Sequence, residues 1–165
     1  MGIAPSISSG VETSVSPVLG LLALSRIFGQ EFSSLPSKFE LMFILNPSAS
    51  LDFQASSKFI DYLSSAIKNR IQLVICLDSL VSLNKLYVYD SLKSSKSQLR
   101  DYFVNKLGAQ EKGIFERAGS FVPYEHVVYA ERGLSAITIT ASDTTYLNKY
   151  HKFSILDRDF QLSGL

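Results

Sequence analysis

Polar side chains follow three apolar segments of this sequence. Asp78 comes directly after IQLVICL, Asn46, Pro47 and Ser48 follow FELMFIL, and Ser142 and Asp143 follow AITITA. In open α/β sheets, binding and catalytic groups gather at the carboxyl ends of the strands. If the three segments are strands of one sheet, these side chains are the first candidates for a functional site.

Further acidic and imidazole side chains extend this set. Glu12 lies in the stretch before the first expected helix, Glu125 and His126 begin a later one, and His151 lies near the end of the chain. Carboxylates and imidazoles are ligands of zinc, although their spacing here matches no local zinc-binding motif.

Each of these residues also has an ordinary structural role open to it. An aspartate after a strand, such as Asp78, commonly caps a turn or a neighbouring helix. Glu12 would ordinarily be a solvated acid on a loop, and His151 a histidine on the surface. His126 would ordinarily cap its helix or pack against neighbouring side chains. The residue types alone leave both interpretations open.

Two other chemistries are disfavoured. Ser48 lacks the G-x-S-x-G context of a hydrolase nucleophile, and no Ser-His-Asp order supports it. Cys76 lies within an apolar segment and is expected to be inert. The glycines are isolated at turns and helix ends, so the sequence contains no phosphate-binding loop.

Four segments have helical patterns. Ser16 as N-cap, Pro17 at the first helical position and Gly29 as a stop predict a helix over residues 17–29. Apolar spacing predicts a second helix over Phe53–Ala66, with Phe53, Phe59, Ile60, Leu63 and Ile67 on one face. Two more are expected at Ser94–Leu107, with Leu99, Tyr102, Phe103 and Leu107 inward before Gly108, and at Tyr124–Arg132 before Gly133.

Four apolar runs of strand length lie between these helices. They are Lys38–Leu45, Ile71–Leu77, Leu86–Tyr89 and Ala136–Ala141, and residues 142–156 read as a polar loop. The continuous run at Ile71–Leu77 is typical of a strand covered on both faces. The alternation of strands and helices predicts an α/β fold, with helices covering a mixed, mostly parallel sheet.

The composition is that of one globular domain. The 165 residues are 46% hydrophobic and carry a net charge of +1, with one cysteine. Binding of nucleic acid needs a concentrated cationic face, whereas the lysines and arginines of this sequence are scattered and balanced by acidic residues. We therefore do not expect nucleic acid as a partner. A single cysteine forms no internal disulfide. The N-terminal residues have no secretory-signal pattern, and no apolar run approaches the roughly 20 residues that cross a bilayer.

Five segments in order resemble the M28 zinc aminopeptidase superfamily, and among its members the nicastrin-related branch whose catalytic site is degenerate. They are GIAPSISSGVETSVSPVLGLLALSRIF, LMFILNPSASLDFQASSKFIDYL, IQLVICLDS, PYEHVVYAERGLSAITITAS and KYHKFSILDRD. The resemblance implies an M28-like domain over residues 1–165. It also implies that the family's early strands, its last helix, an export signal and a membrane anchor lie outside this chain, so we expect a partial domain.

Peptidases of this family hold two zinc ions with a His-x-Asp, a bridging Asp, a Glu-Glu pair, a strand-end Asp and a late His. The resemblance assigns Glu12 to the bridging position, Asp78 to the strand-end position and His151 to the late His position. Pro47 and Ser48 take the place of the Glu-Glu pair, which removes a metal ligand and the general base that deprotonates the zinc-bound water. Glu125 and His126 match an acidic-His pair beside the site.

These departures imply a pseudo-peptidase with no catalytic residue, no metal and no cofactor. Glutamate has one methylene more than aspartate, so the carboxylate of Glu12 would lie about 1.5 Å from the position of the family's bridging aspartate carboxylate. Zinc-ligand distances vary by only about 0.2 Å, so the bridge would need remodelling. The resemblance further implies a lumenal protein-binding domain at the endoplasmic reticulum membrane. Its implied partners are a Nodal modulator-like protein and a small multipass membrane protein, in a translocon-associated complex for the biogenesis of multipass membrane proteins.

Two alternatives stay open. The first is a divergent zinc aminopeptidase or cyclase that keeps one metal on Glu12, Asp78 and His151, with Glu125 as its base. The second is a substrate-recognition subunit of the nicastrin or glycosylphosphatidylinositol-transamidase type, because these also use degenerate members of this fold.

Overall fold

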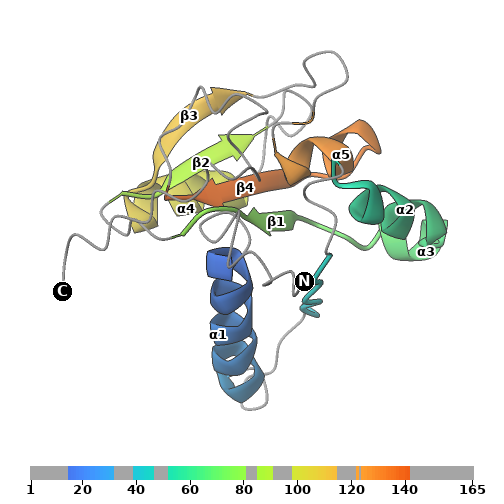
Figure 1. Ribbon diagram of the computed structural model, residues 1–165, viewed down its shortest axis with the longest axis horizontal. Coiled ribbons are helices and arrows are strands. Elements are labelled where there is room, and N and C mark those ends of the chain that lie inside the picture. The colour runs from blue at the N-terminus through green and yellow to red at the C-terminus, as the bar shows by residue number, and fades with distance from the viewer. Residues whose placement is uncertain are drawn as a thin grey trace, which may run out of the picture.

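The described part of the chain forms a four-stranded sheet with helices packed around it (Figure 1). A computed structural model describes residues 15–31, 39–46, 52–80, 85–90, 98–114, 122 and 124–141. The elements are α1 (Ser16–Glu31), α2 (Gln54–Tyr62), α3 (Ser65–Lys68), β1 (Val74–Leu77), β2 (Tyr87–Asp90), α4 (Gln98–Leu107), β3 (Gln110–Ile114), α5 (Glu125–Glu131) and β4 (Ala136–Thr140).

The sheet is mixed, with the strand order β1-β4-β2-β3. β1 and β4 are parallel, with Cys76 opposite Thr138, and β2 and β3 are parallel. β2 and β4 are antiparallel, with Val88 opposite Ile139. Two of the three pairings are therefore parallel, which confirms the predicted α/β class. All five residues of β4 are buried, as expected for a central β-branched strand.

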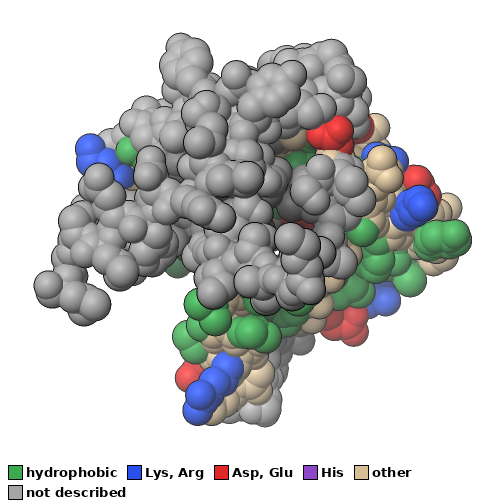
Figure 2. All heavy atoms as spheres, in the orientation of Figure 1, with side chains coloured by type: hydrophobic (Ala, Val, Ile, Leu, Met, Phe, Trp, Pro, Cys, Tyr) green, Lys and Arg blue, Asp and Glu red, His purple; other side chains and the backbone are tan. Residues whose placement is uncertain are grey.

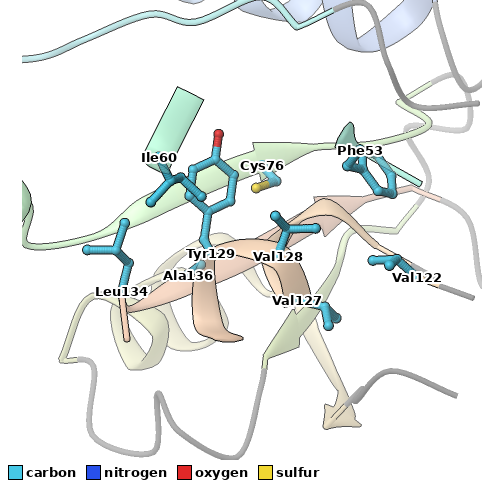
Figure 3. Close-up of a cluster of buried hydrophobic side chains, with 9 residues drawn as sticks. All are labelled: Phe53, Ile60, Cys76, Val122, Val127, Val128, Tyr129, Leu134 and Ala136. Atoms are coloured by element: carbon cyan, nitrogen blue, oxygen red, sulfur yellow. The ribbon is translucent and has the colours of Figure 1, made fainter. Parts of the chain in front are cut away.

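The larger core cluster lies between α2, α5 and one face of the sheet (Figure 3). Side chains alternate across a strand, so Ala136 of β4 faces this cluster while Ile137 and Ile139 face a second one. The second cluster includes Val88 of β2 and Ala109, which follows α4. The buried members of the first cluster are Phe53, Ile60, Cys76, Val122, Val127, Val128, Tyr129, Leu134 and Ala136.

The predicted first helix is confirmed as α1, which projects away from the sheet (Figure 1). Ser16 Oγ accepts a hydrogen bond from the backbone N–H of Leu80 at 2.9 Å, which ties the start of the helix to the segment after β1. Gly20 lies close to Leu80, since an added Cβ would come within 2.7 Å of its Cδ1. Gly29 does not end the helix, and none of the α1 side chains is buried.

The later helices end as predicted. Gly108 follows α4 with φ 62° and Gly133 follows α5 with φ 81°, a left-handed conformation that glycine adopts without strain. The inward orientation predicted for Tyr102 is wrong, because its side chain is 55% exposed. The inward orientation predicted for Leu99, Phe103 and Leu107 stays a prediction, because their side chains lie outside the described part of the chain.

Two predicted elements differ from the structure. Residues 39–46 have no regular secondary structure, so the strand predicted over Lys38–Leu45 is wrong for this part of the chain. An apolar run becomes a strand only where a neighbour accepts its backbone hydrogen bonds, and none of the described strands pairs with it. The single helix predicted over Phe53–Ala66 is instead α2 and α3. Leu63 is extended, and Ser64 Oγ accepts from the N–H of Ile67 at 3.4 Å, starting a new helical turn.

Two strands also differ from expectation. β1 is shorter than predicted and lies at one edge of the described sheet, with Ile75 44% exposed, so coverage of both faces was an incorrect expectation. A continuous apolar run does not distinguish a central strand from an edge strand. β3 (QEKGI) was not predicted because Ile114 is its one residue of the β-branched and aromatic types typical of strands. The polar loop predicted over residues 142–156 lies outside the described residues.

No helix in the described ranges has the length and hydrophobicity needed to span a bilayer.

Candidate functional site

Two of the predicted site residues, Asp78 and Glu125, come together where β1 ends and α5 begins. Asp78 follows β1, and its backbone N–H donates to the carbonyl of Ile139 at 3.0 Å, which continues the pairing with β4. Glu125 is the first residue of α5. The charge on Asp78 is close enough to raise the pKa of Glu125. Asp78 thus follows the carboxyl end of β1 and Glu125 begins α5, as the sequence predicts, while their role as site residues stays a prediction.

The Glu125 carboxylate is held by neutral side chains. Ser56 Oγ donates to Glu125 Oε1 at 2.5 Å, and Asn46 Nδ2 donates to Ser56 Oγ at 3.0 Å. Ser56 is completely buried in α2. This chain of hydrogen bonds links α5, α2 and the residue that immediately precedes Pro47.

Opposing effects act on the protonation of Glu125. Burial raises the pKa of its carboxyl group most, and the nearby Asp78 charge raises it further. Hydrogen bonds from Ser56, Asn46 and Tyr129 stabilise the carboxylate and lower the pKa, but the net pKa is above its ordinary value. Glu125 is therefore a carboxyl group that can take up a proton at a higher pH than an exposed glutamate.

His126 lies on the core side of Glu125 and is completely buried. Its Nδ1 is 2.8 Å from Thr138 Oγ1 in β4. Its ring stacks on Tyr124 with a centroid distance of 5.9 Å, and Tyr124 stacks on Tyr89 of β2 at 4.6 Å. This surrounds the imidazole with core side chains from α5 and the sheet.

Cys76 lies next to this region within the larger core cluster (Figure 3). Its side chain is 5% exposed, and burial raises its pKa well above the ordinary range, helped by the charges of Glu125 and Asp78. The thiolate is the nucleophilic form of cysteine, so this environment suppresses its reactivity.

The other predicted site residues lie outside the described part of the chain. These are Glu12, Pro47, Ser48, Ser142, Asp143 and His151. Their placement around Asp78 and Glu125 stays a prediction.

The described residues do not form a zinc centre. Within these ranges, no group of three or more His, Cys, Asp or Glu side chains is arranged to hold a metal ion. Catalytic zinc normally has three protein ligands, whereas Asp78 and Glu125 supply two carboxylates. Glu125 Oε1 is also occupied by the hydroxyl group of Ser56. The donors around Glu125 are suited to stabilising a carboxylate rather than to completing a metal site.

Sequence reasoning missed the partners of Glu125 and His126. Ser56 is 69 residues from Glu125 along the chain, and Thr138 is 12 residues from His126. Ser56 has no motif that distinguishes it from other helical serines, so no sequence signal pointed to it. Asn46, in contrast, was among the candidates, because it follows a predicted strand in the same way as Asp78.

Comparison with known proteins supports a family relationship. A model described as "Peptidase family M28" matches residues 3–154. The "BOS complex subunit NCLN" of Gallus gallus is 25% identical over 158 residues, which cover 84% of this chain and 28% of that protein. The protein of the same name from Canis lupus familiaris is 23% identical over 158 residues, again with 84% of this chain and 28% of that protein covered. The chain therefore spans less than a third of the length of these relatives. No solved structure matches it.

Proposed function

The chain belongs to peptidase family M28, and from this membership we propose that it is a pseudo-peptidase domain, related to nicalin, that binds proteins instead of cleaving them. The proposed domain covers residues 1–165. In it the family's catalytic machinery is replaced by hydrogen-bonded neutral side chains, and the sheet and its helices serve as a scaffold.

The observation that carries this proposal is the environment of Glu125. Its carboxylate accepts from the buried hydroxyl of Ser56, which in turn accepts from Asn46. The next two residues, Pro47 and Ser48, stand at the positions that the family resemblance assigns to the Glu-Glu pair. Proline has no side-chain group that could carry a proton or bind a metal. A base and a ligand are therefore both missing, which supports a binding role without a metal cofactor.

The relatives suggest the setting of this role. Both are named as subunits of the BOS complex, so we propose that this chain also acts within a multi-subunit complex. We place that complex at the endoplasmic reticulum membrane, near the translocon, with the domain in the lumen. The proposed partners are a Nodal modulator-like protein and a small multipass membrane protein, and the proposed task is the biogenesis of multipass membrane proteins.

Co-purification tests this proposal. The tagged protein is isolated from detergent-solubilised membranes of its own cells, and the recovered proteins are identified by mass spectrometry. We expect both partners in near-stoichiometric amounts. A heat-denatured sample of the same tagged protein serves as the misfolded control. Recovery of a folded protein that brings neither partner would overturn the proposal.

A divergent zinc hydrolase is the second candidate, and the raised pKa of Glu125 beside Asp78 favours it. In this alternative Glu12, Asp78 and His151 hold one zinc ion. Elemental analysis of the purified protein separates the two proposals. Stoichiometric zinc that is lost in Asp78→Ala would favour the hydrolase, whereas zinc far below one equivalent supports the pseudo-peptidase.

A further inference from the structure

Residues 39–46 are attached to the rest of the described chain in an unusual way. Their sequence has the apolar pattern of a strand, but they belong to none of the described strands. Most of their apolar side chains face solvent. Phe39, Met42 and Leu45 are 67%, 66% and 61% exposed. Neither a ladder of strand hydrogen bonds nor deep burial of these side chains therefore holds the segment in place.

Side-chain contacts connect this segment with three different neighbours. Near its start, Glu40 Oε2 lies 3.4 Å from Arg70 Nη2, which follows α3. Near its middle, the ring of Phe43 meets that of Phe28 in α1, with centroids 6.5 Å apart. At its end, Asn46 Nδ2 donates to Ser56 Oγ in α2 at 3.0 Å.

These contacts differ in their expected strength. Both side chains of the Glu40–Arg70 pair are more than 70% exposed, and exposed ion pairs contribute little. Asn46 instead bonds to a completely buried hydroxyl group. That hydroxyl group donates its proton to Glu125 while it accepts from Asn46, so each bond strengthens the other.

We propose that residues 39–46 form a strap that opens and closes on the domain, and that the Asn46–Ser56–Glu125 hydrogen bonds are the latch that keeps it closed. Opening the latch detaches the residue next to Pro47 from α2 and lets the strap move together with its exposed apolar side chains. It leaves the α2–α5 core intact, because Arg132 independently joins these helices through Asp61 and Ser57. The strap then opens in a local step that does not require the core to unfold.

Limited proteolysis of the purified protein with chymotrypsin, with the cleavage sites identified by mass spectrometry, tests the strap. Removing the hydroxyl group in Ser56→Ala disconnects Asn46 from Glu125. We expect cleavage within residues 39–46 to become about five- to tenfold faster, because cleavage follows the population of the open form and loss of roughly one buried hydrogen bond changes that population by this factor. Cleavage within β4 and in the second half of α5 should be unchanged.

Two more variants make the result decisive. Ser57→Ala is the matched control, because the neighbouring hydroxyl group bonds to Arg132 instead of the latch, and it should leave cleavage of the strap unchanged. Asn46→Ala breaks the latch from the strap side, at a partly buried position, and should reproduce the effect of Ser56→Ala even if that variant folds poorly. Unchanged cleavage within residues 39–46 in Asn46→Ala, or equal acceleration in Ser57→Ala, would overturn the proposal. Neither outcome bears on partner binding, so this test is separate from that of the proposed function.

Discussion

Glu125 is a carboxyl group whose charge is supported by neutral donors within a partly buried site. Ser56, Asn46 and Tyr129 stabilise its ionised form, while burial and the charge of Asp78 destabilise it more. The raised pKa that results makes the stability of the fold depend on pH through this one residue.

We therefore predict a pH-dependent effect of Glu125→Gln. The folded protein holds this proton more tightly than the unfolded chain, so the contribution is favourable below the unfolded pKa of about 4.3. It is lost as pH rises through the higher folded pKa. Glutamine stays neutral, and its oxygen can still accept from Ser56. Relative to the natural protein, the variant should gain unfolding free energy as pH rises from about 4 up to the folded pKa of Glu125, by at most about 1.4 kcal/mol per pH unit.

Urea unfolding at several pH values measures this difference. Glu40→Gln is the control, because the side chain of Glu40 is 88% exposed, and it should show no comparable gain. A difference between Glu125→Gln and the natural protein that is constant over this pH range would contradict the raised pKa.

The candidate site was predictable from sequence only in part. Asp78 and Glu125 were found because a strand end and a helix start are local features. Their neighbours were not, because the bond between Ser56 and Glu125 joins residues that only the packing of α2 against α5 brings together. His126 illustrates the same limit, since its burial between Tyr124 and Thr138 depends on the sheet.

At the scale of elements, the glycine after α5 sets the direction in which the chain enters β4. Gly133 has φ 81°, and the N–H groups of Gly133 and Leu134 close the helix on the carbonyls of Ala130 and Tyr129. We predict that Gly133→Ala lowers the unfolding free energy by about 1 kcal/mol or more, because a side chain strains this conformation. An added Cβ meets no atom within 4 Å, so the cost is conformational rather than steric.

Gly29→Ala should change the stability in the opposite direction. Urea unfolding of the Gly133→Ala and Gly29→Ala variants measures the two changes in unfolding free energy. Gly29 is also open around its Cβ position, but it lies within α1, where alanine is favoured over glycine by up to about 1 kcal/mol. We expect a small gain in stability. If both substitutions change the unfolding free energy in the same direction, the conformational explanation is wrong.

Elements with strong local signals were predicted correctly. α1 begins at Ser16-Pro17, a pair of residue types typical of a helix start, and β4 consists of β-branched residues and one alanine. β3 was missed because its residues are typical of loops, and it is a strand only through its pairing with β2. Residues 39–46 show the converse, since a strong apolar pattern does not make a strand without a partner among the described strands.

At the scale of the whole molecule, apolar side chains gather on α1, away from the sheet (Figure 2). Leu19, Leu22 and Ile27 are all more than half exposed. The strap adds the apolar residues Phe39, Met42 and Leu45, and Phe43 connects it to α1. Large exposed apolar surfaces on a soluble domain mark places where it associates with other molecules.

This surface predicts that the purified chain associates with itself as its concentration rises. Sedimentation velocity should show a growing weight-average sedimentation coefficient, and Leu22→Lys should reduce it by placing a charge within the apolar contact. Ala23→Lys puts the same charge on the next residue of α1 while keeping Leu22, and should reduce association less. A chain that stays monomeric at all concentrations would contradict the prediction. Both variants add one positive charge, but only Leu22→Lys removes a large apolar side chain. An equal effect of the two would therefore assign the change in association to net charge and not to burial of apolar area.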